Sequence, residues 1–323
     1  MKFVVFGADE ALGMVHGDRI LDLATAASTD GGSENATTVF GSLLTLIEAG
    51  DRGLNLAAEL MDKYAGSDRP GVNLDLQTTP LRAPFPGRRL AFAGNNFATH
   101  VANAFTNRGN PKNAEDVYAE GRKSKATGFW VISPPVGTGA EIPVPRAANG
   151  VDALFDYEGE VAVVLGRGGK RLRAQEWEPR IWGTVLMIDW SLRPPTGLAG
   201  ARPFYGHKNF DASKSLGPWI SVGEVDPMNC QVQTRVNGDV RQDFNTAEMT
   251  YSYAELLEQI AEDLTLLPGD ILSGGTGPGT AMDATKADAD GPGPLDLYLD
   301  PGDAVVLSSP ELGALRGRVV AGD

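Results

Sequence analysis

The chain has 323 residues, of which 42% are hydrophobic and 22% are charged, as is typical of a soluble globular protein with a large core. Its 28 lysines and arginines face 42 aspartates and glutamates, and the net charge of −14 argues against nucleic acid or an anionic membrane surface as a partner. A single cysteine, Cys230, excludes an internal disulfide framework and fits a reducing compartment.

The 40 glycines and 21 prolines favour a strand-rich fold with many loops over a helical bundle. We expect no membrane-spanning helix, because no apolar run is long enough, and no signal peptide, because Asp9 and Glu10 soon interrupt the apolar start. These observations predict a cytoplasmic location. With only three histidines, any metal would be a hard cation with oxygen ligands, such as Mg²⁺, Mn²⁺ or Ca²⁺.

The first part of the chain predicts a small α/β unit. It begins with short strands, and residues 38–64 then change to a helical pattern that Gly50 and Gly53 interrupt. A polar stretch with several prolines follows. We place a domain boundary there, between a small N-terminal domain at 1–83 and a catalytic domain at 84–323.

The segment RLAFAGNNFATHVANAF, residues 89–105, predicts a short strand, a turn and a helix that carries His100. A polar region over 106–128 follows, and connections of this length are often lids over a binding site. Its helical part, Ala114 to Gly121, would cover a pocket. Two interpretations of His100 stay open at this point: a helix-face histidine without a role, or a catalytic group beside the lid.

Two glutamates stand at the start of the apolar run Val161 to Leu165, which predicts a buried strand. Glu158 and Glu160 are separated by one residue, so they project from the same face of an extended chain, with Cα atoms roughly 6.5–7 Å apart. Two neighbouring anions repel each other unless a cation lies between them. We expect a metal, a basic side chain or a solvent-exposed strand end.

A third carboxylate, Asp189, stands near the end of the next apolar strand, Ile181 to Trp190. Burying it is costly unless it is paired or bound to a cation, and we favour a metal over a helix cap or a salt bridge. The loop that follows is rich in basic groups, which suggests an anionic small ligand or charge balance for the acids. Its polar side chains are Arg193, Arg202, Tyr205, His207 and Lys208.

The last third predicts a hairpin over 232–244 with an Asn-Gly turn, and an amphipathic helix over 250–264. A glycine-rich loop, GGTGPGTAMD, covers residues 274–283. It lacks the lysine of a phosphate-binding P-loop, which argues against a nucleotide site. It would instead bring backbone N–H groups or the hydroxyl of Thr276 close to a ligand oxygen.

Six blocks, in order over residues 84–323, resemble the fumarylacetoacetate hydrolase family. They read DYEGEVAVVLG, WGTVLMIDWSLR, GHKNF with LGPWIS, VNGDVRQDFNTAEMTYSYAELL, LLPGDILSGGT and PGDAVVL. The resemblance implies a mainly β, α+β fold, a mixed β-sandwich roll with a small N-terminal α/β domain. It also implies a divalent metal, Mg²⁺ or else Mn²⁺ or Ca²⁺, held by Glu158, Glu160 and Asp189.

The resemblance implies further roles for individual residues. His100 and Lys208 would be catalytic, and the substrate would contact Arg193, Tyr205 and Thr276. Many small members of the family carry a glutamate three residues after this histidine, whereas this chain has Asn103, closer to the form in fumarylacetoacetase itself. The acid partner of His100 must therefore come from elsewhere. We consider the lid carboxylates Glu115, Asp116 and Glu120.

The activity that the resemblance implies is metal-dependent hydrolysis of a C–C bond in a β-diketone acid, such as an acylpyruvate or fumarylacetoacetate, through an enolate. The same site would also suit a decarboxylase, hydratase or isomerase of a 2-oxo acid. A further alternative is a catalytically inactive metal- or ligand-binding protein. We expect a homodimer of aromatic catabolism whose partner is a small anionic 2-oxo or diketo acid.

Overall fold

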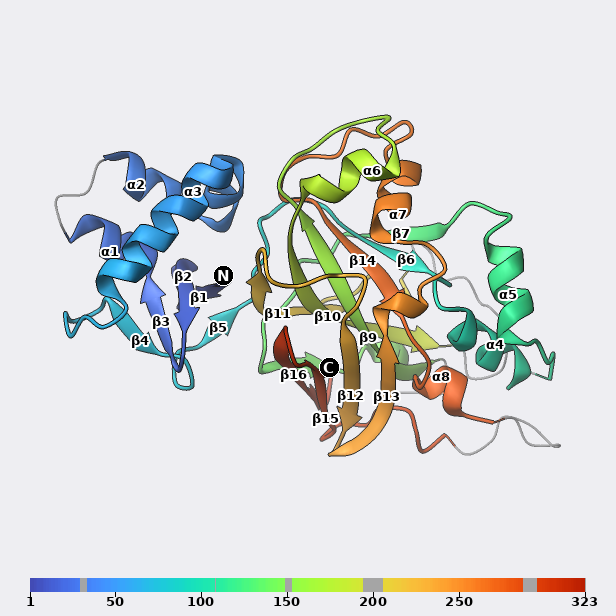
Figure 1. The fold of residues 1–323 in the computed structure, drawn as a ribbon. Helices are drawn as coiled ribbons and strands as arrows, with labels where there is room; N and C mark the ends of the chain where they lie inside the picture. The colour runs from blue at the N-terminus through green and yellow to red at the C-terminus, as the bar shows by residue number, and fades with distance from the viewer. Residues whose placement is uncertain (30–33, 108, 149–152, 194–205, 287–294, 323) are drawn as a thin grey trace.

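The computed structural model of the chain describes residues 1–29, 34–107, 109–148, 153–193, 206–286 and 295–322. Within these residues the protein has the predicted α+β fold, in which two mixed sheets are flanked by helices (Figure 1). None of the helices described is long and apolar enough to cross a membrane.

The larger sheet runs through the whole molecule. Its strands are β1 (Lys2–Phe6), β2 (Ala11–His16), β3 (Arg19–Asp22), β4 (Asn73–Asp75), β5 (Leu81–Arg82), β6 (Leu90–Gly94), β7 (Thr127–Val131), β9 (Leu154–Leu165), β10 (Ile181–Arg193), β11 (Lys214–Ser221) and β14 (Ile271–Thr276). They lie in the order β4-β3-β2-β1-β11-β10-β9-β14-β6-β7, and β5 pairs with β1. The long antiparallel pair β9–β10 occupies the middle of the sheet and will carry the site.

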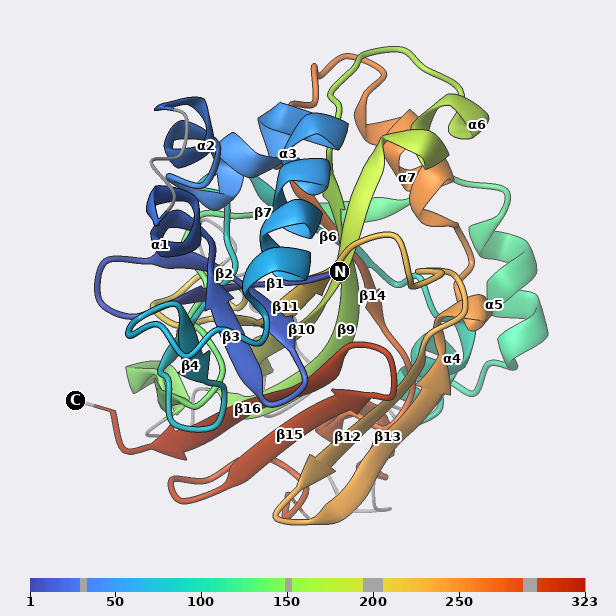
Figure 2. The ribbon, with the colours of Figure 1, turned by 60° about the vertical axis from the view of Figure 1, so that its left-hand side comes forward.

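The smaller sheet lies against the middle of the larger one. Its strands are β8 (Ala140–Pro143), β12 (Gln231–Val236), β13 (Asp239–Asn245), β15 (Ala304–Ser309) and β16 (Gly313–Val320). Figure 2 shows β12, β13, β15 and β16 side by side. The predicted hairpin is confirmed, because Asn237 and Gly238 join β12 to β13 with positive φ values of 51° and 94°.

The N-terminal residues form α1 (Leu23–Ser28), α2 (Glu34–Val39) and α3 (Leu43–Tyr64) beside strands β1 to β5 (Figure 1). Helix α3 kinks at Gly50, where φ is 56°, but it continues through Gly53, so only one of the two predicted breaks occurs. Strand β1 pairs with β11, and the sheet is therefore continuous across the boundary predicted near residue 83. The division into two domains stays a prediction.

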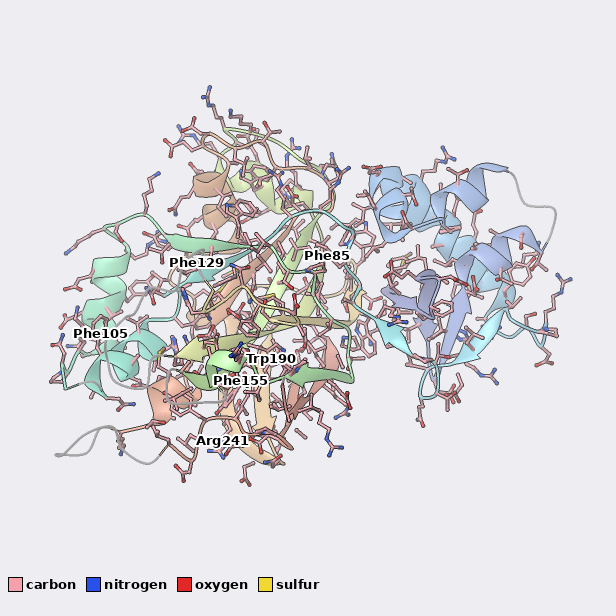
Figure 3. All side chains as sticks on the ribbon, turned by 180° about the vertical axis from the view of Figure 1, so that it is seen from behind. Phe85, Phe105, Phe129, Phe155, Trp190 and Arg241 are labelled. Atoms are coloured by element: carbon pink, nitrogen blue, oxygen red, sulfur yellow. The ribbon has the colours of Figure 1, made fainter. Side chains whose placement is uncertain are left out.

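Successive residues of β9 alternate between two hydrophobic cores. Tyr157 and Val161 point into the core beside the smaller sheet, whereas Ala162 and Val164 point into the core beside the N-terminal helices. In the first core Phe155 and the indole of Trp190 stack with ring centroids 6.0 Å apart (Figure 3). By the same alternation, the even-numbered glutamates of β9 face the second core.

The remaining helices lie beside the central strands. They are α4 (Ala98–Thr106), α5 (Ala114–Gly121), α6 (Ala174–Trp177), α7 (Tyr253–Ile260) and α8 (Ala281–Ala284). The helix predicted over Ala114 to Gly121 is confirmed as α5, and none of its residues is buried. Its role as a lid stays a prediction. Figure 1 shows α4, α5 and α8 on the same side of the molecule.

Candidate metal centre

Three carboxylates meet on one face of the central strand pair. Glu158 lies directly opposite Asp189 in the β9–β10 register, and Glu160 lies two residues further along β9. One oxygen from each of the three lies within 4.8 Å of the others. The side chains are buried, because Glu158, Glu160 and Asp189 are 6%, 1% and 0% exposed. The sequence prediction that these residues come together is confirmed.

Their position within the strands differs from the prediction. Strand β9 begins at Leu154 and β10 continues to Arg193, so the carboxylates lie inside the sheet and not at strand ends. Pairing over the whole length of the two strands extends the sheet beyond the apolar runs visible in the sequence. A solvent-exposed strand end is therefore excluded, and the negative charges need compensation inside the protein.

The two glutamates are in different electrostatic environments. For Glu158, burial alone would raise the pKa, but Arg193, Lys208 and His100 outweigh it and hold the pKa well below the ordinary value. For Glu160, burial, together with the charges of Asp189 and Glu158, raises the pKa well above the ordinary value. Glu158 is thus stabilised as an anion, whereas at Glu160 the charge of Lys208 does not outweigh burial and the two neighbouring carboxylates.

The hydrogen bonds of Glu160 agree with this difference. Its Oε2 accepts a bond of 2.5 Å from Ser273 Oγ on β14, and no ion pair to Glu160 occurs among the described residues. Three buried carboxylates within reach of one another, one of them without a cationic partner, are the oxygen donor set that a hard divalent cation prefers. The residues present therefore fit such an ion.

Lysine and arginine side chains balance the other carboxylates. Lys208 Nζ lies 2.5 Å from Glu158 Oε2, 2.8 Å from Asp189 Oδ2 and 2.6 Å from Ser191 Oγ. Arg193 donates from Nε to Asp156 Oδ2 at 2.9 Å and pairs through a second nitrogen with Glu158. Lys208 and Arg193, two of the basic residues expected in one loop, thus contact the acidic cluster directly.

His100 takes its acid partner from the end of the glycine-rich loop. Its Nδ1 lies 3.0 Å from Asp283 Oδ2, and both side chains are buried. Asp283 also accepts hydrogen bonds from the backbone N–H of Gly279 and from Thr280 Oγ1. The partner is therefore none of the three lid carboxylates considered from the sequence. Asp116 and Glu120 contact Asn113 and Lys112, and among the described residues no contact joins Glu115 to His100.

The predicted substrate contacts have different outcomes. Thr276 lies in the sheet, where its Oγ1 donates to Gly159 O at 2.9 Å and accepts from Gln242 Nε2 at 2.8 Å. Arg193 lies beside the carboxylates as described above. Tyr205 is outside the described residues. A contact between any of these residues and a substrate stays a prediction.

The sequence reasoning missed several residues of the site. Asp156 was detectable, because it precedes Glu158 by two residues and so shares its face of β9. It accepts hydrogen bonds from the N–H groups of Tyr157 and Ala281 and pairs with Arg193. Lys214, Ser273 and Asp283 were also missed, and only the pairing of distant segments brings them to the site.

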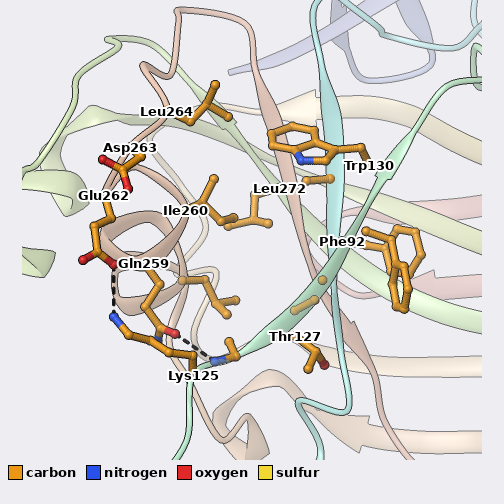
Figure 4. Close-up of a pocket in the computed structure, with 16 residues that line it drawn as sticks. Phe92, Lys125, Thr127, Trp130, Gln259, Ile260, Glu262, Asp263, Leu264 and Leu272 are labelled. Carbon is orange, nitrogen blue, oxygen red and sulfur yellow. Dashed lines mark hydrogen bonds and ion pairs between the residues drawn. The ribbon is translucent and has the colours of Figure 1, made fainter.

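A separate cavity of about 570 Å³ lies between β6, β7 and α7 (Figure 4). Ala91 and Leu272 line it, and they project from the opposite face of the sheet to Ser273, which contacts Glu160. At its rim Lys125 and Glu262 form an ion pair of 3.3 Å. The cavity is therefore on the other side of the sheet from the carboxylates and is not the candidate metal centre.

The chain matches the model of a known protein family over most of its length. The family model for the fumarylacetoacetate (FAA) hydrolase C-terminal region matches residues 90–320. The chain therefore belongs to the fumarylacetoacetate hydrolase family, as the six sequence blocks suggested.

Relatives that match in sequence include two oxaloacetate tautomerases and one uncharacterized protein. The oxaloacetate tautomerase YisK of Bacillus subtilis is 26% identical over 294 residues, which are 87% of either chain. MJ1656, an uncharacterized protein of Methanocaldococcus jannaschii, is 36% identical over 153 residues, 46% of this chain and 63% of that protein. The mitochondrial oxaloacetate tautomerase Fahd2a of Rattus norvegicus is 33% identical over 167 residues, 51% of this chain and 50% of the relative.

Solved structures share the fold over the full length. Maleylpyruvate hydrolase from Sphingobium sp. SYK-6, in complex with manganese(II) and pyruvate, covers 100% of both chains with a TM-score of 0.71 and 20% identity. A fumarylacetoacetate hydrolase from Exiguobacterium antarcticum covers 99% of both chains with a TM-score of 0.68 and 24% identity.

Proposed function

We propose that the protein is a divalent-metal-dependent hydrolase that cleaves a C–C bond in a small β-diketone acid, such as an acylpyruvate. The observation that carries this proposal is the buried trio of carboxylates near a histidine that is held by its own carboxylate. His100 is close enough to Glu158 to lower the pKa of that group, so the base and the carboxylates belong to one site.

Glu158, Glu160 and Asp189 would hold the cation, for which we propose Mg²⁺ or Mn²⁺. When bound, such an ion supplies Lewis-acid polarisation of the substrate's oxygen atoms. The manganese and pyruvate in the maleylpyruvate hydrolase structure, which shares the fold, support a divalent metal and a 2-oxo acid as ligands. For this chain the identity of the ion and of the acid is part of the proposal.

His100 would act as the general base. A hydrogen bond from its Nδ1–H to Asp283 keeps Nε2 free to take a proton and stabilises the imidazolium that results. In hydrolysis, Nε2 accepts the proton of a water molecule that attacks the acyl carbonyl. The lid helix α5 follows α4, which carries His100, and would limit the access of bulk water to this step.

Lys208 would stabilise the negative charge that develops on the departing enolate. Its ammonium group is 5% exposed and points into the carboxylate cluster, where a low dielectric strengthens each electrostatic interaction. Arg193, Thr276 and Tyr205 remain the predicted contacts of the substrate. For Arg193, the two ion pairs already described favour a role in positioning Glu158.

A second candidate function is keto–enol tautomerisation of oxaloacetate. YisK, which matches over 87% of either chain, carries this activity in its name, as do the mammalian relatives. The same residues would serve, since His100 could move a proton at the carbon next to the keto group in place of a proton on water. A cytoplasmic location, a homodimer and a part in aromatic catabolism stay predictions from the family.

One assay separates the two functions. The full chain, loaded with Mg²⁺ or Mn²⁺, is mixed with a panel of acylpyruvates and with oxaloacetate. Release of pyruvate from an acylpyruvate supports the hydrolase, whereas faster keto–enol exchange of oxaloacetate without a new acid product supports the tautomerase. The E160Q variant is the control, and we expect it to lose both the metal and the activity. No turnover of any substrate would contradict both functions.

A further inference from the structure

Lys214 is a fully buried lysine beside the acidic cluster. It begins β11 directly opposite Asp189 in the β10–β11 register, and its side chain is 0% exposed. Its Nζ lies 2.8 Å from Asp189 Oδ1 and donates to the carbonyl oxygens of Lys208 at 2.6 Å and Ser213 at 3.0 Å. The ammonium group thus makes two hydrogen bonds to backbone carbonyls and one ion pair to Asp189 Oδ1, an oxygen that accepts no hydrogen bond from the described residues.

The two oxygens of Asp189 are held by different lysines. Lys208 contacts Oδ2, and it also contacts Glu158, so its partners are oxygens that a bound cation would need. The other two partners of Lys214 are backbone carbonyls, which stay in place whatever the site contains. Lys208 is therefore the lysine that must release Asp189 when a cation binds, and Lys214 is the one that stays.

We propose that Lys214 is a positioning residue that restricts Asp189 to a single ligand oxygen, Oδ2, and so makes the site prefer Mg²⁺ and Mn²⁺ over Ca²⁺. Mg²⁺ requires near-octahedral geometry at short distances, whereas Ca²⁺ takes six to eight oxygens and accepts both oxygens of one carboxylate. Because Oδ1 is ion-paired with the Lys214 ammonium group, an ion that bound both oxygens of Asp189 would have to displace this pair. The inference rests on the metal centre of the proposed function and deepens it.

The test is the ratio of Ca²⁺ to Mg²⁺ and Mn²⁺ affinities, measured by calorimetry on the full chain without substrate. We expect the wild type to bind Mg²⁺ and Mn²⁺ more tightly than Ca²⁺, and K214M to shift this ratio toward Ca²⁺ about tenfold, the lower end of the effect of residues that support metal ligands. The ratio isolates geometry from charge, because all three ions carry the same charge and a lost ammonium affects them equally.

Two further variants complete the measurement. K214R keeps a charged N–H donor, and we expect it to retain the wild-type ratio. K125M replaces an exposed lysine at the cavity rim on the other face of the sheet, and we expect no change. An unchanged ratio in a folded K214M protein, or a wild type that prefers Ca²⁺, would overturn the proposal.

A crystal structure of the Mn²⁺-loaded wild type gives an independent answer if K214M fails to fold. One oxygen of Asp189 on the ion, with the other within hydrogen-bond distance of Lys214, supports the proposal, and two oxygens on the ion overturn it. Neither measurement uses a substrate. Failure to hydrolyse any diketo acid would therefore contradict the proposed function and leave the result for Lys214 intact.

Discussion

His100 receives its partner from a residue 183 positions away in the chain. The contact depends on two short helices, α4 and α8, that lie together at one end of the central strands. Asp283 is itself held by the N–H of Gly279 and by the Thr280 hydroxyl, so the loop before α8 orients the carboxylate. Such a histidine–carboxylate pair selects one tautomer of the imidazole and fixes the orientation of the ring.

Replacing Asp283 tests this arrangement. We expect D283N to keep the fold and the metal and to lower kcat about 100-fold, since general-base catalysis contributes about 10²–10⁴-fold and the imidazole itself stays in place. KM should change little, because Asp283 does not contact the substrate in the proposed mechanism. The measurement is steady-state kinetics with the best diketo-acid substrate. E120Q on the lid helix is the matched control, and equal losses in the two variants would contradict the assignment.

Cys230 gives a prediction about pH. Burial, followed by the charges of Glu311 and Asp226, raises the pKa of its thiol to about 12 from an ordinary 9.0. The contribution of this group to stability is therefore complete below pH 9.0 and is lost as the pH rises from there toward about 12. We expect a thiol reagent to label the native protein very slowly up to pH 9 and the urea-unfolded protein at once; fast native labelling would contradict this.

The E-G-E segment has a structural reason for its glycine at the level of the strand. Glu158 and Glu160 face the site, and Gly159 between them faces the smaller sheet. A Cβ atom at this position would lie 2.3 Å from Thr234 Oγ1 and 2.7 Å from Leu307 Cδ1. The glycine therefore allows β12 and β15 to approach β9, and this packing supports the two glutamate side chains from behind.

We expect G159A to destabilise the protein by about 1–3 kcal/mol, the usual cost of inserting a methyl group into a packed interior. The measurement is the free energy of unfolding from urea titration, followed by calorimetry of Mn²⁺ binding. G66A is the matched control, because a Cβ at Gly66 meets nothing within 4 Å. A G159A protein as stable as the control would show that the two sheets pack less tightly than described.

In the molecule as a whole, the N-terminal strands extend the larger sheet, which carries the acidic cluster. Lys2 and Phe3 pair with Ser221 and Ile220 of β11, and the Phe3 ring stacks on Trp182 with centroids 5.6 Å apart. Trp182 belongs to β10, the strand that also carries Asp189. The N-terminal unit therefore shares a hydrophobic core with the strand pair of the site, which favours unfolding of the protein as one cooperative unit.

Phe3 is 0% exposed, and its truncation tests this coupling. We expect F3A to cost about 3–5 kcal/mol, as is usual for a buried phenylalanine, and to lower the midpoint of a single thermal transition. Calorimetry and fluorescence should report the same midpoint. Two separate transitions, with only the first shifted by F3A, would instead support independent domains at 1–83 and 84–323.

Local sequence patterns predicted the three carboxylates of the site and the class of fold. Strand periodicity places Glu158 and Glu160 on one face, and the second apolar strand supplies Asp189, because these are local patterns that need no knowledge of distant contacts. The hairpin turn and helix α5 were predictable because they too follow from local patterns. The family blocks extended these local patterns to Lys208 and Arg193.

The other side chains of the site are brought there by long-range contacts, which are visible only in the tertiary structure. The partner of His100 comes from α8, the lysine that pairs with Asp189 comes from β11, and the serine that contacts Glu160 comes from β14. Strand order and register determine these side-chain contacts, and both depend on how the hydrophobic faces pack over the whole chain. Side-chain pairing across a sheet is a long-range property, which is why no local pattern indicated Asp283 or Lys214.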